Sequence, residues 1–172
     1  MARHRGPLLV DTNVILECWR IGAWGALSGG YLVETVEDCV IETQTGFQNR
    51  RAEEAVDATT LLTSLAHAPY SVTALQLAAL DLAAAGIQLD PGERSLWAHA
   101  LERQDAWVVC GPDRASLRVG VRLGFRDRLV ALETLLTDAG YRPRTALKRN
   151  YSAAWHAQII GEYVVMERKA HP

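Results

Sequence analysis

Leu8-Leu9-Val10-Asp11-Thr12-Asn13 is the stretch that most constrains the fold of this chain. Three consecutive apolar residues between turn formers are typical of a strand buried on both faces, as in parallel sheets. Asp11 then follows the carboxyl end of the strand, and Thr12 and Asn13 can cap the next helix. Open α/β sheets bind their ligands at the carboxyl ends of the strands. Asp11 is therefore either a candidate metal ligand or only a helix cap.

The length and composition are those of one globular domain. The chain has 172 residues, of which 49% are hydrophobic and 22% are charged, and such a chain can bury a real core. No apolar run is long enough to cross a bilayer, and no signal peptide follows the basic start. We therefore expect a cytoplasmic protein with no membrane partner. Cys18, Cys39 and Cys110 are too far apart to indicate a disulfide framework or a zinc site.

The net charge of −2 hides an asymmetry between the two parts of the chain. Residues 1–100 contain six Lys and Arg against twelve Asp and Glu, whereas residues 101–172 contain twelve against eight. Such an asymmetry hints at an anionic partner for the basic part. Nearly all of the bases are Arg, which favours bidentate contacts with phosphate.

The apolar pattern predicts strands that alternate with helices. Beyond 8–10, strands are predicted at 31–36 and 106–110, with short ones at 71–73 and 129–132. Helices are predicted at 14–28, from 37, and at 50–67, 75–85, 90–103, 114–123, 133–140 and 152–164. This alternation favours a three-layer α/β/α sandwich around a parallel sheet. We expect residues 1–140 to form the domain and residues 141–172 to form a basic loop and a helix packed on it.

Four carboxylates are predicted at the ends of elements. Asp11 and Asp113 follow buried strands, and Glu42 and Glu93 lie in the first turns of helices. Because neighbouring strands are about 4.8 Å apart, acids at two strand ends can share one ion. Oxygen-only ligands select Mg²⁺ or Mn²⁺ rather than zinc.

Each of these acids also has a purely structural interpretation. Glu93 completes a capping box with Asp90, and Asp113 favours the positive end of a helix. Glu42 fits a solvated helix residue. Taken singly, each acid is more often structural than catalytic, so the metal hypothesis depends on all four together.

Four short segments carry a resemblance to a known family. They are Leu8-Leu9-Val10-Asp11-Thr12-Asn13-Val14-Ile15-Leu16, Val40-Ile41-Glu42-Thr43, Leu89-Asp90-Pro91-Gly92-Glu93-Arg94 and Val108-Val109-Cys110-Gly111-Pro112-Asp113-Arg114. In order and spacing, over about residues 8–132, the chain resembles the PIN-domain nucleases, which include VapC-type toxin ribonucleases and related stand-alone PIN proteins. Gly111 departs from the pattern, since many relatives have a hydroxyl residue there.

The resemblance implies an activity and a site. It implies a PIN-like fold and a Mg²⁺- or Mn²⁺-dependent endoribonuclease that hydrolyses phosphodiester bonds in RNA. A cognate antitoxin and a homodimer are the further partners that it leaves open. The implied catalytic residues are Asp11, Glu42, Glu93 and Asp113, of which Asp11, Glu93 and Asp113 would bind the metal, with Asn13 in support.

A row of arginines extends the site on the predicted helix 114–123. Arg114, Arg118 and Arg122 are four residues apart and therefore share one helix face, which begins beside Asp113. The spacing predicts contacts with RNA phosphates, and a solvated helix face is an equal alternative.

Two rival functions come from other classes. A haloacid-dehalogenase-type phosphatase also begins with a strand-end Asp, but it needs a second Asp where this chain has Asn13. A non-catalytic PIN-like module that binds RNA or protein is the second rival, and it stays open because the sequence cannot show whether the acids assemble.

Overall fold

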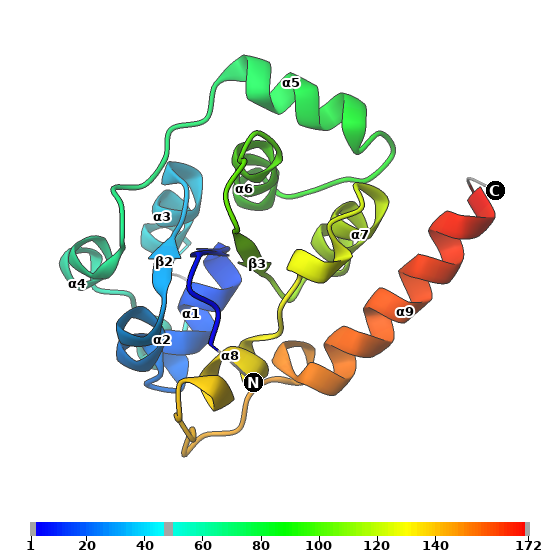
Figure 1. The fold of residues 1–172 in the computed structure, drawn as a ribbon. Coiled ribbons are helices and arrows are strands. Elements are labelled where there is room, and N and C mark those ends of the chain that lie inside the picture. The colour runs from blue at the N-terminus through cyan, green and yellow to red at the C-terminus, as the bar shows by residue number, and fades with distance from the viewer. Residues whose placement is uncertain (1–2, 47–49, 171–172) are drawn as a thin grey trace.

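A parallel sheet lies at the centre of the computed structural model, which describes residues 3–46 and 50–170 (Figure 1). The strand order is β2-β1-β3, so β1 pairs with both of the others. The strands are β1 (Pro7–Val10), β2 (Leu32–Glu34) and β3 (Val108–Cys110). The helices are α1 (Thr12–Arg20), α2 (Trp24–Gly30), α3 (Glu37–Gln44), α4 (Ala58–Ser64), α5 (Ala74–Ala83), α6 (Pro91–Leu101), α7 (Arg114–Arg122), α8 (Leu132–Asp138) and α9 (Ala153–Ala170). Short 3-10 turns are η2 (Ala52–Glu54), η3 (Arg126–Arg128) and η4 (Arg149–Tyr151).

The register of the sheet brings the carboxyl ends of the strands to one edge. Leu9 of β1 lies opposite Glu34 of β2 and Val109 of β3, and all three strands run parallel. Asp11 is the first residue beyond β1 and caps α1. The predicted strand at 8–10 and the position of Asp11 at its carboxyl end are therefore confirmed.

Buried apolar side chains pack on both faces of the sheet. On one face Leu8 and Val10 join residues of α1, α2 and α8. On the other face Leu9 and Val109 join residues of α5 and α6, including the fully buried Trp97. The α/β class is confirmed, and helices on both faces are compatible with a three-layer α/β/α sandwich.

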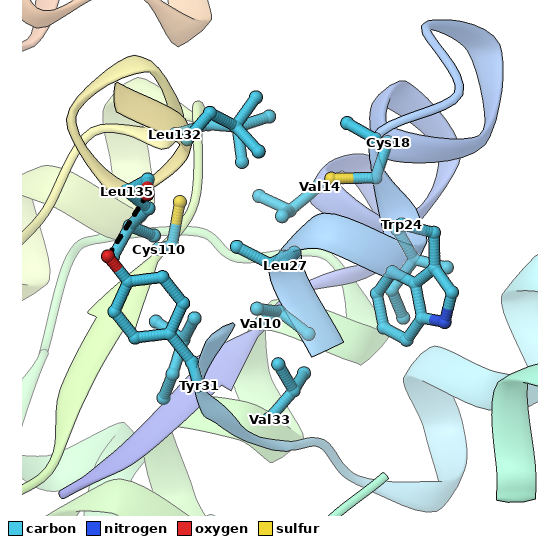
Figure 2. Packing of buried hydrophobic residues seen from close by; sticks show 14 of the residues in the cluster. Val10, Val14, Cys18, Trp24, Leu27, Tyr31, Val33, Cys110, Leu132 and Leu135 are labelled. Carbon is cyan, nitrogen blue, oxygen red and sulfur yellow. Dashed lines mark hydrogen bonds between the residues drawn. The ribbon is translucent and has the colours of Figure 1, made fainter. Parts of the chain in front are cut away.

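Figure 2 shows the first of these clusters at close range. Val10 of the middle strand lies among side chains from α1 and α2, such as Val14 and Leu27. The hydroxyl of Tyr31 donates a hydrogen bond of 3.0 Å to the backbone carbonyl of Leu135. This bond joins the end of α2 to α8 and satisfies a polar group inside the core.

Two of the predicted helices are wrong in extent. The helix predicted at 14–28 is divided into α1 and α2 because the chain turns at Gly22, which has a positive φ of 69°. Glycine adopts this conformation without the cost that a side chain adds. The helix predicted at 50–67 is replaced by η2 and α4, because the Asp57 carboxylate accepts from the backbone N–H of Thr60 and starts a new helix there.

The short strands predicted at 71–73 and 129–132 are also wrong. Tyr70 forms only an isolated bridge to Val36, beyond β2, and Leu129 only one to Val109 of β3. Thr73 caps α5 and Leu132 begins α8. The last helix, α9, runs further than the predicted end at 164. Residues 1–2 and 171–172 of the predicted segments lie outside the described residues. Within the described ranges, no helix combines the length and the apolar content needed to cross a bilayer.

Candidate functional site

Asp11 divides its two carboxylate oxygens between two environments. One oxygen accepts a hydrogen bond of 2.8 Å from the backbone N–H of Val14 and so caps α1. The other, Oδ2, is buried and has no hydrogen-bond partner among the described residues. The cap interpretation is therefore correct for one oxygen, and the second oxygen is left available to a ligand. A buried acceptor without a partner is costly and calls for an explanation.

The two carboxylate oxygens of Glu93, at the amino end of α6, also lie in two different environments. Its Oε2 accepts from the backbone N–H of Asp90, and the Asp90 carboxylate accepts from the N–H of Glu93 at 2.8 Å. These two bonds form the predicted capping box. The other oxygen, Oε1, is buried and has no partner in the described part of the chain. Asp11 and Glu93 are thus both helix caps with one unsatisfied oxygen.

Glu42 has a different role, because both of its oxygens are occupied. Oε2 accepts from the Thr12 hydroxyl at 2.5 Å, and Oε1 accepts from the backbone N–H of Gly92 at 2.9 Å. The carboxylate therefore connects α3 to the first turns of α1 and α6. A side chain at Gly92 would place Cβ 2.5 Å from Glu42 Oε2. The expectation that Glu42 is merely solvated does not hold, since it positions the helices that carry the other acids.

Asp113 lies half-buried beyond β3, where it caps α7 through the backbone N–H of Ala115 at 2.7 Å. The preceding Gly111 lies directly against Asp11, since a Cβ at this position would be 3.0 Å from Asp11 Oδ2. The same point is 3.6 Å from the hydroxyl oxygen of Ser116 in α7. The hydroxyl that the sequence lacks at 111 is thus present nearby on Ser116, which the sequence analysis missed.

The carboxylates influence one another across the edge of the sheet. Burial, followed by the charges of Asp90, Asp113 and Glu42, raises the pKa of Asp11 to about 8. Burial, followed by the charges of Asp113, Asp90 and Asp11, raises the pKa of Glu93 to about 9. All four predicted acids therefore take part in one electrostatic cluster. Asp90 belongs to it as well, although its sequence position indicated only a cap.

The acids are gathered but are not arranged as a ready ligand set. Within residues 3–46 and 50–170, no group of three or more His, Cys, Asp or Glu side chains is placed to hold a metal ion. Asn13, the predicted supporting residue, uses its backbone carbonyl to accept from the Tyr151 hydroxyl at 3.0 Å. Its side chain makes no hydrogen bond with the described residues.

The predicted arginine face is engaged by another part of the chain. Arg114 pairs with Glu162 at 2.7 Å, and Arg118 and Arg122 pair with Glu167 at 2.8 and 2.9 Å. Both glutamates belong to α9, which packs along α7 through apolar contacts around Leu117. Contact between these arginines and RNA phosphates therefore requires the ion pairs to open.

Comparison of the chain with protein-family models, with curated proteins and with solved structures finds no match.

Proposed function

We propose that this chain is a metal-dependent endoribonuclease with a PIN-like α/β/α domain, and that it hydrolyses phosphodiester bonds in RNA. One observation carries the proposal: Asp11 and Glu93 each leave one buried oxygen without a partner among the described residues, and the charge of Asp11 acts on Glu93. The position at the carboxyl ends of parallel strands, where α/β proteins bind ligands, supports it further.

The donor set fits a hard divalent cation. Both unpartnered atoms are carboxylate oxygens, and the half-buried Asp113 adds a third carboxylate that acts on both of them. Oxygen ligands favour Mg²⁺ or Mn²⁺. The described residues include no preformed group of three ligands, so binding of Mg²⁺ would need water or substrate phosphate to complete its ligand set.

The roles of the residues follow from their contacts. Asp11 and Glu93 would hold the cation, with Asp113 nearby, while Glu42 connects α3 to α1 and α6 through Thr12 and the N–H of Gly92. A bound cation supplies charge stabilisation at the phosphoryl group and lowers the pKa of a water molecule.

The proposal extends to the setting of the protein. The sequence favours the cytoplasm, and the resemblance to VapC-type toxins leaves a cognate antitoxin and a homodimer open as partners. These partners rest on the resemblance alone.

Cleavage of a labelled RNA by the purified protein tests the proposal. Mg²⁺ or Mn²⁺ should support cleavage, EDTA should stop it, and Asp11→Asn should lower the rate by more than about a hundredfold. Asp57→Asn is the matched control, because Asp57 also caps a helix through a carboxylate oxygen but is exposed and far from the other acids in sequence. This control should cleave at the parental rate.

Two results would reject the proposal. One is cleavage that persists in excess EDTA after dialysis, and the other is an Asp11→Asn variant as active as the parent. A parent that binds RNA but leaves it intact with either metal would instead favour a non-catalytic binding module, which the lack of a preformed ligand group also favours.

A further inference from the structure

The loop between α8 and α9 concentrates positive charge. Residues 141–151 contain four Lys or Arg and no Asp or Glu. Three of the four, Arg142, Arg144 and Arg149, are exposed and form no ion pair with any described residue. Lys148 differs, since its ammonium group lies 3.2 Å from Glu54. We call Arg142, Arg144 and Arg149 the basic strap.

A buried carboxylate fixes this loop on α1. The backbone N–H of Lys148 donates to Glu17 Oε1 at 2.9 Å, and the Glu17 side chain has no exposed surface. Arg20, which pairs with Glu17, also donates to the backbone carbonyl of Ala146 at 2.8 Å. The strap is therefore presented by an ordered backbone, so less conformational entropy remains to be lost when a ligand binds.

The end of the loop reaches the acidic site. The buried Tyr151 donates from its hydroxyl to the carbonyl of Asn13, two residues beyond Asp11. Burial and the charge of Asp11 raise the pKa of Tyr151. The loop thus passes from the exposed strap to the helix that Asp11 caps, within a few residues.

The two groups of arginines contrast in their freedom to bind an anion. The guanidinium groups of Arg114, Arg118 and Arg122 pair with glutamates of α9. Those of the strap have no such partner among the described residues. An incoming phosphate gains the full interaction with an unpaired guanidinium, whereas on α7 it must displace a carboxylate.

We propose that the basic strap binds the sugar-phosphate backbone of RNA along α1, from the carboxyl end of this helix, where the Tyr141 hydroxyl donates to the carbonyl of Ile21, towards its amino end at Asp11. The inference rests on the proposed function for the identity of the ligand. Arginine suits this role because its planar fork of donors matches the oxygens of a phosphate. The α7 arginines serve mainly to hold α9.

Binding of a fluorescein-labelled single-stranded RNA, measured by anisotropy in EDTA over a range of KCl concentrations, tests the strap without cleavage. We expect the triple variant Arg142→Gln, Arg144→Gln, Arg149→Gln to bind more than about tenfold more weakly at low salt. Its slope of log affinity against log salt should fall by about 2, since each single-strand phosphate contact contributes about 0.7.

The matched control removes the same charge from α7. The variant Arg114→Gln, Arg118→Gln, Arg122→Gln should bind within about twofold of the parent and keep its salt slope. If this control melts early, the single variants Arg144→Gln and Arg114→Gln, both at exposed positions, give the same comparison. A strap variant with parental affinity and slope, or a larger loss in the α7 variant, would overturn the inference.

Cleavage assays on the same proteins separate this inference from the proposed function. A parent that binds RNA through the strap but does not cut it with Mn²⁺ would support the strap and reject the nuclease. A parent that cuts RNA in an Asp11-dependent manner, together with a strap variant that binds normally, would reject the strap alone.

Discussion

Buried carboxylates in two regions of this molecule differ in one respect, their partners. At the edge of the sheet, Asp11 and Glu93 are 2% and 4% exposed, and each leaves an oxygen unsatisfied. On α1 and on α9, Glu17 and Glu167 are 1% and 8% exposed, and arginines pair with them. The exposed fractions are alike, so burial alone does not separate the two groups.

The pKa values of the two groups move in opposite directions. Burial and neighbouring acids raise the pKa of Asp11 and of Glu93. Burial would also raise the pKa of Glu17, but the Arg20 guanidinium and the N–H of Lys148 outweigh it and hold that pKa below its ordinary value. The Arg122 guanidinium, with Arg118, lowers the pKa of Glu167 to about 2. The first group disfavours its own charge and the second stabilises it, as expected for a ligand site and for structural ion pairs.

The largest change in stability should come from removing a buried carboxylate that is paired with an arginine. Glu17→Ala removes the acceptor of Arg20 and of the loop backbone, and it should cost about 3–5 kcal/mol of unfolding free energy, because breaking a buried pair leaves a charge uncompensated. Chemical denaturation measures this cost. The control Glu162→Ala removes an exposed pair and should cost less than about 1 kcal/mol. Equal costs would remove the distinction between a buried and an exposed partner.

Replacing a carboxylate that has an unsatisfied oxygen should change stability in the opposite direction and stabilise the fold. Asp11→Asn removes an acid whose charge is disfavoured first by burial and then by the neighbouring acids. In metal-free buffer near neutral pH it should therefore stabilise the fold, by up to about 4 kcal/mol, since one pKa unit corresponds to about 1.4 kcal/mol. Added Mg²⁺ should raise the melting temperature of the parent more than that of the variant. A variant that is less stable than the parent in EDTA would show that Asp11 belongs with the structural carboxylates.

The pH dependence of stability separates the groups within one protein. Asp11 and Glu93 have folded pKa values of about 8 and 9, above their unfolded values near 4. In this interval the folded state binds up to two more protons than the unfolded state, so stability should fall as the pH rises above about 5, by up to about 1.4 kcal/mol per pH unit for each carboxylate. Urea titrations in EDTA should show this fall in the parent but not in the double variant Asp11→Asn, Glu93→Gln.

Stability should also fall on the acid side, for different reasons. The lowered pKa of Glu167 means that its contribution is lost as the pH falls from about 4 towards 2. Burial lowers the pKa of His156 to about 4, so protonation of this histidine destabilises the fold below about pH 6. Both losses should remain in the double variant. Stability that rises from about pH 5 to 8 in the parent would contradict the assignment of the unsatisfied group.

The smallest change in stability should come from the contact between Gly92 and the Glu42 carboxylate, which we call the Glu42 clamp. Gly92→Ala forces Cβ towards Glu42, whose carboxylate is held at both oxygens, and it should cost about 1 kcal/mol. Gly25→Ala is the matched control, because Gly25 is also the second residue of its helix and has open space around it. That change should stabilise slightly. Thermal unfolding of both variants shows whether the clamp is rigid, and a Gly92→Ala variant as stable as the control would show that it is not.

The sequence predicts best where a local rule agrees with the tertiary structure. The capping box at Asp90 and Glu93 and the turn at Gly124, which has a positive φ of 78°, were both predictable from neighbouring residues. The strand at 8–10 was predictable because a short apolar run between turn formers has few other structures open to it. The helix predicted at 50–67 failed because its apolar stripe outweighed the capping signal of Asp57, which lies within it.

The residues of the candidate site were predictable from the sequence, but the different role of each carboxylate was not. Asp11, Glu93 and Asp113 were correctly placed at the starts of helices. The placement of Glu42 in a first turn was wrong, because α3 begins at Glu37 and Glu42 lies in its second half. The difference between Asp11, with a vacant oxygen, and Glu42, with none, depends on Thr12 and Gly92, which reach Glu42 only after folding. Likewise, the spacing of Arg114, Arg118 and Arg122 identified one helix face, but the acids that cover it come from a helix far along the chain.

The pairing of β1 with β3 has a consequence for biosynthesis. Leu8 lies opposite Val108, so the middle strand must wait for a hundred further residues before its second neighbour exists. At translation rates of about 5–20 residues per second, this wait lasts at least about five seconds. A nascent chain that ends before Val108 carries Asp11 on a strand with one open edge, and it also lacks Asp113. The order of synthesis itself therefore keeps the site unassembled until late in translation.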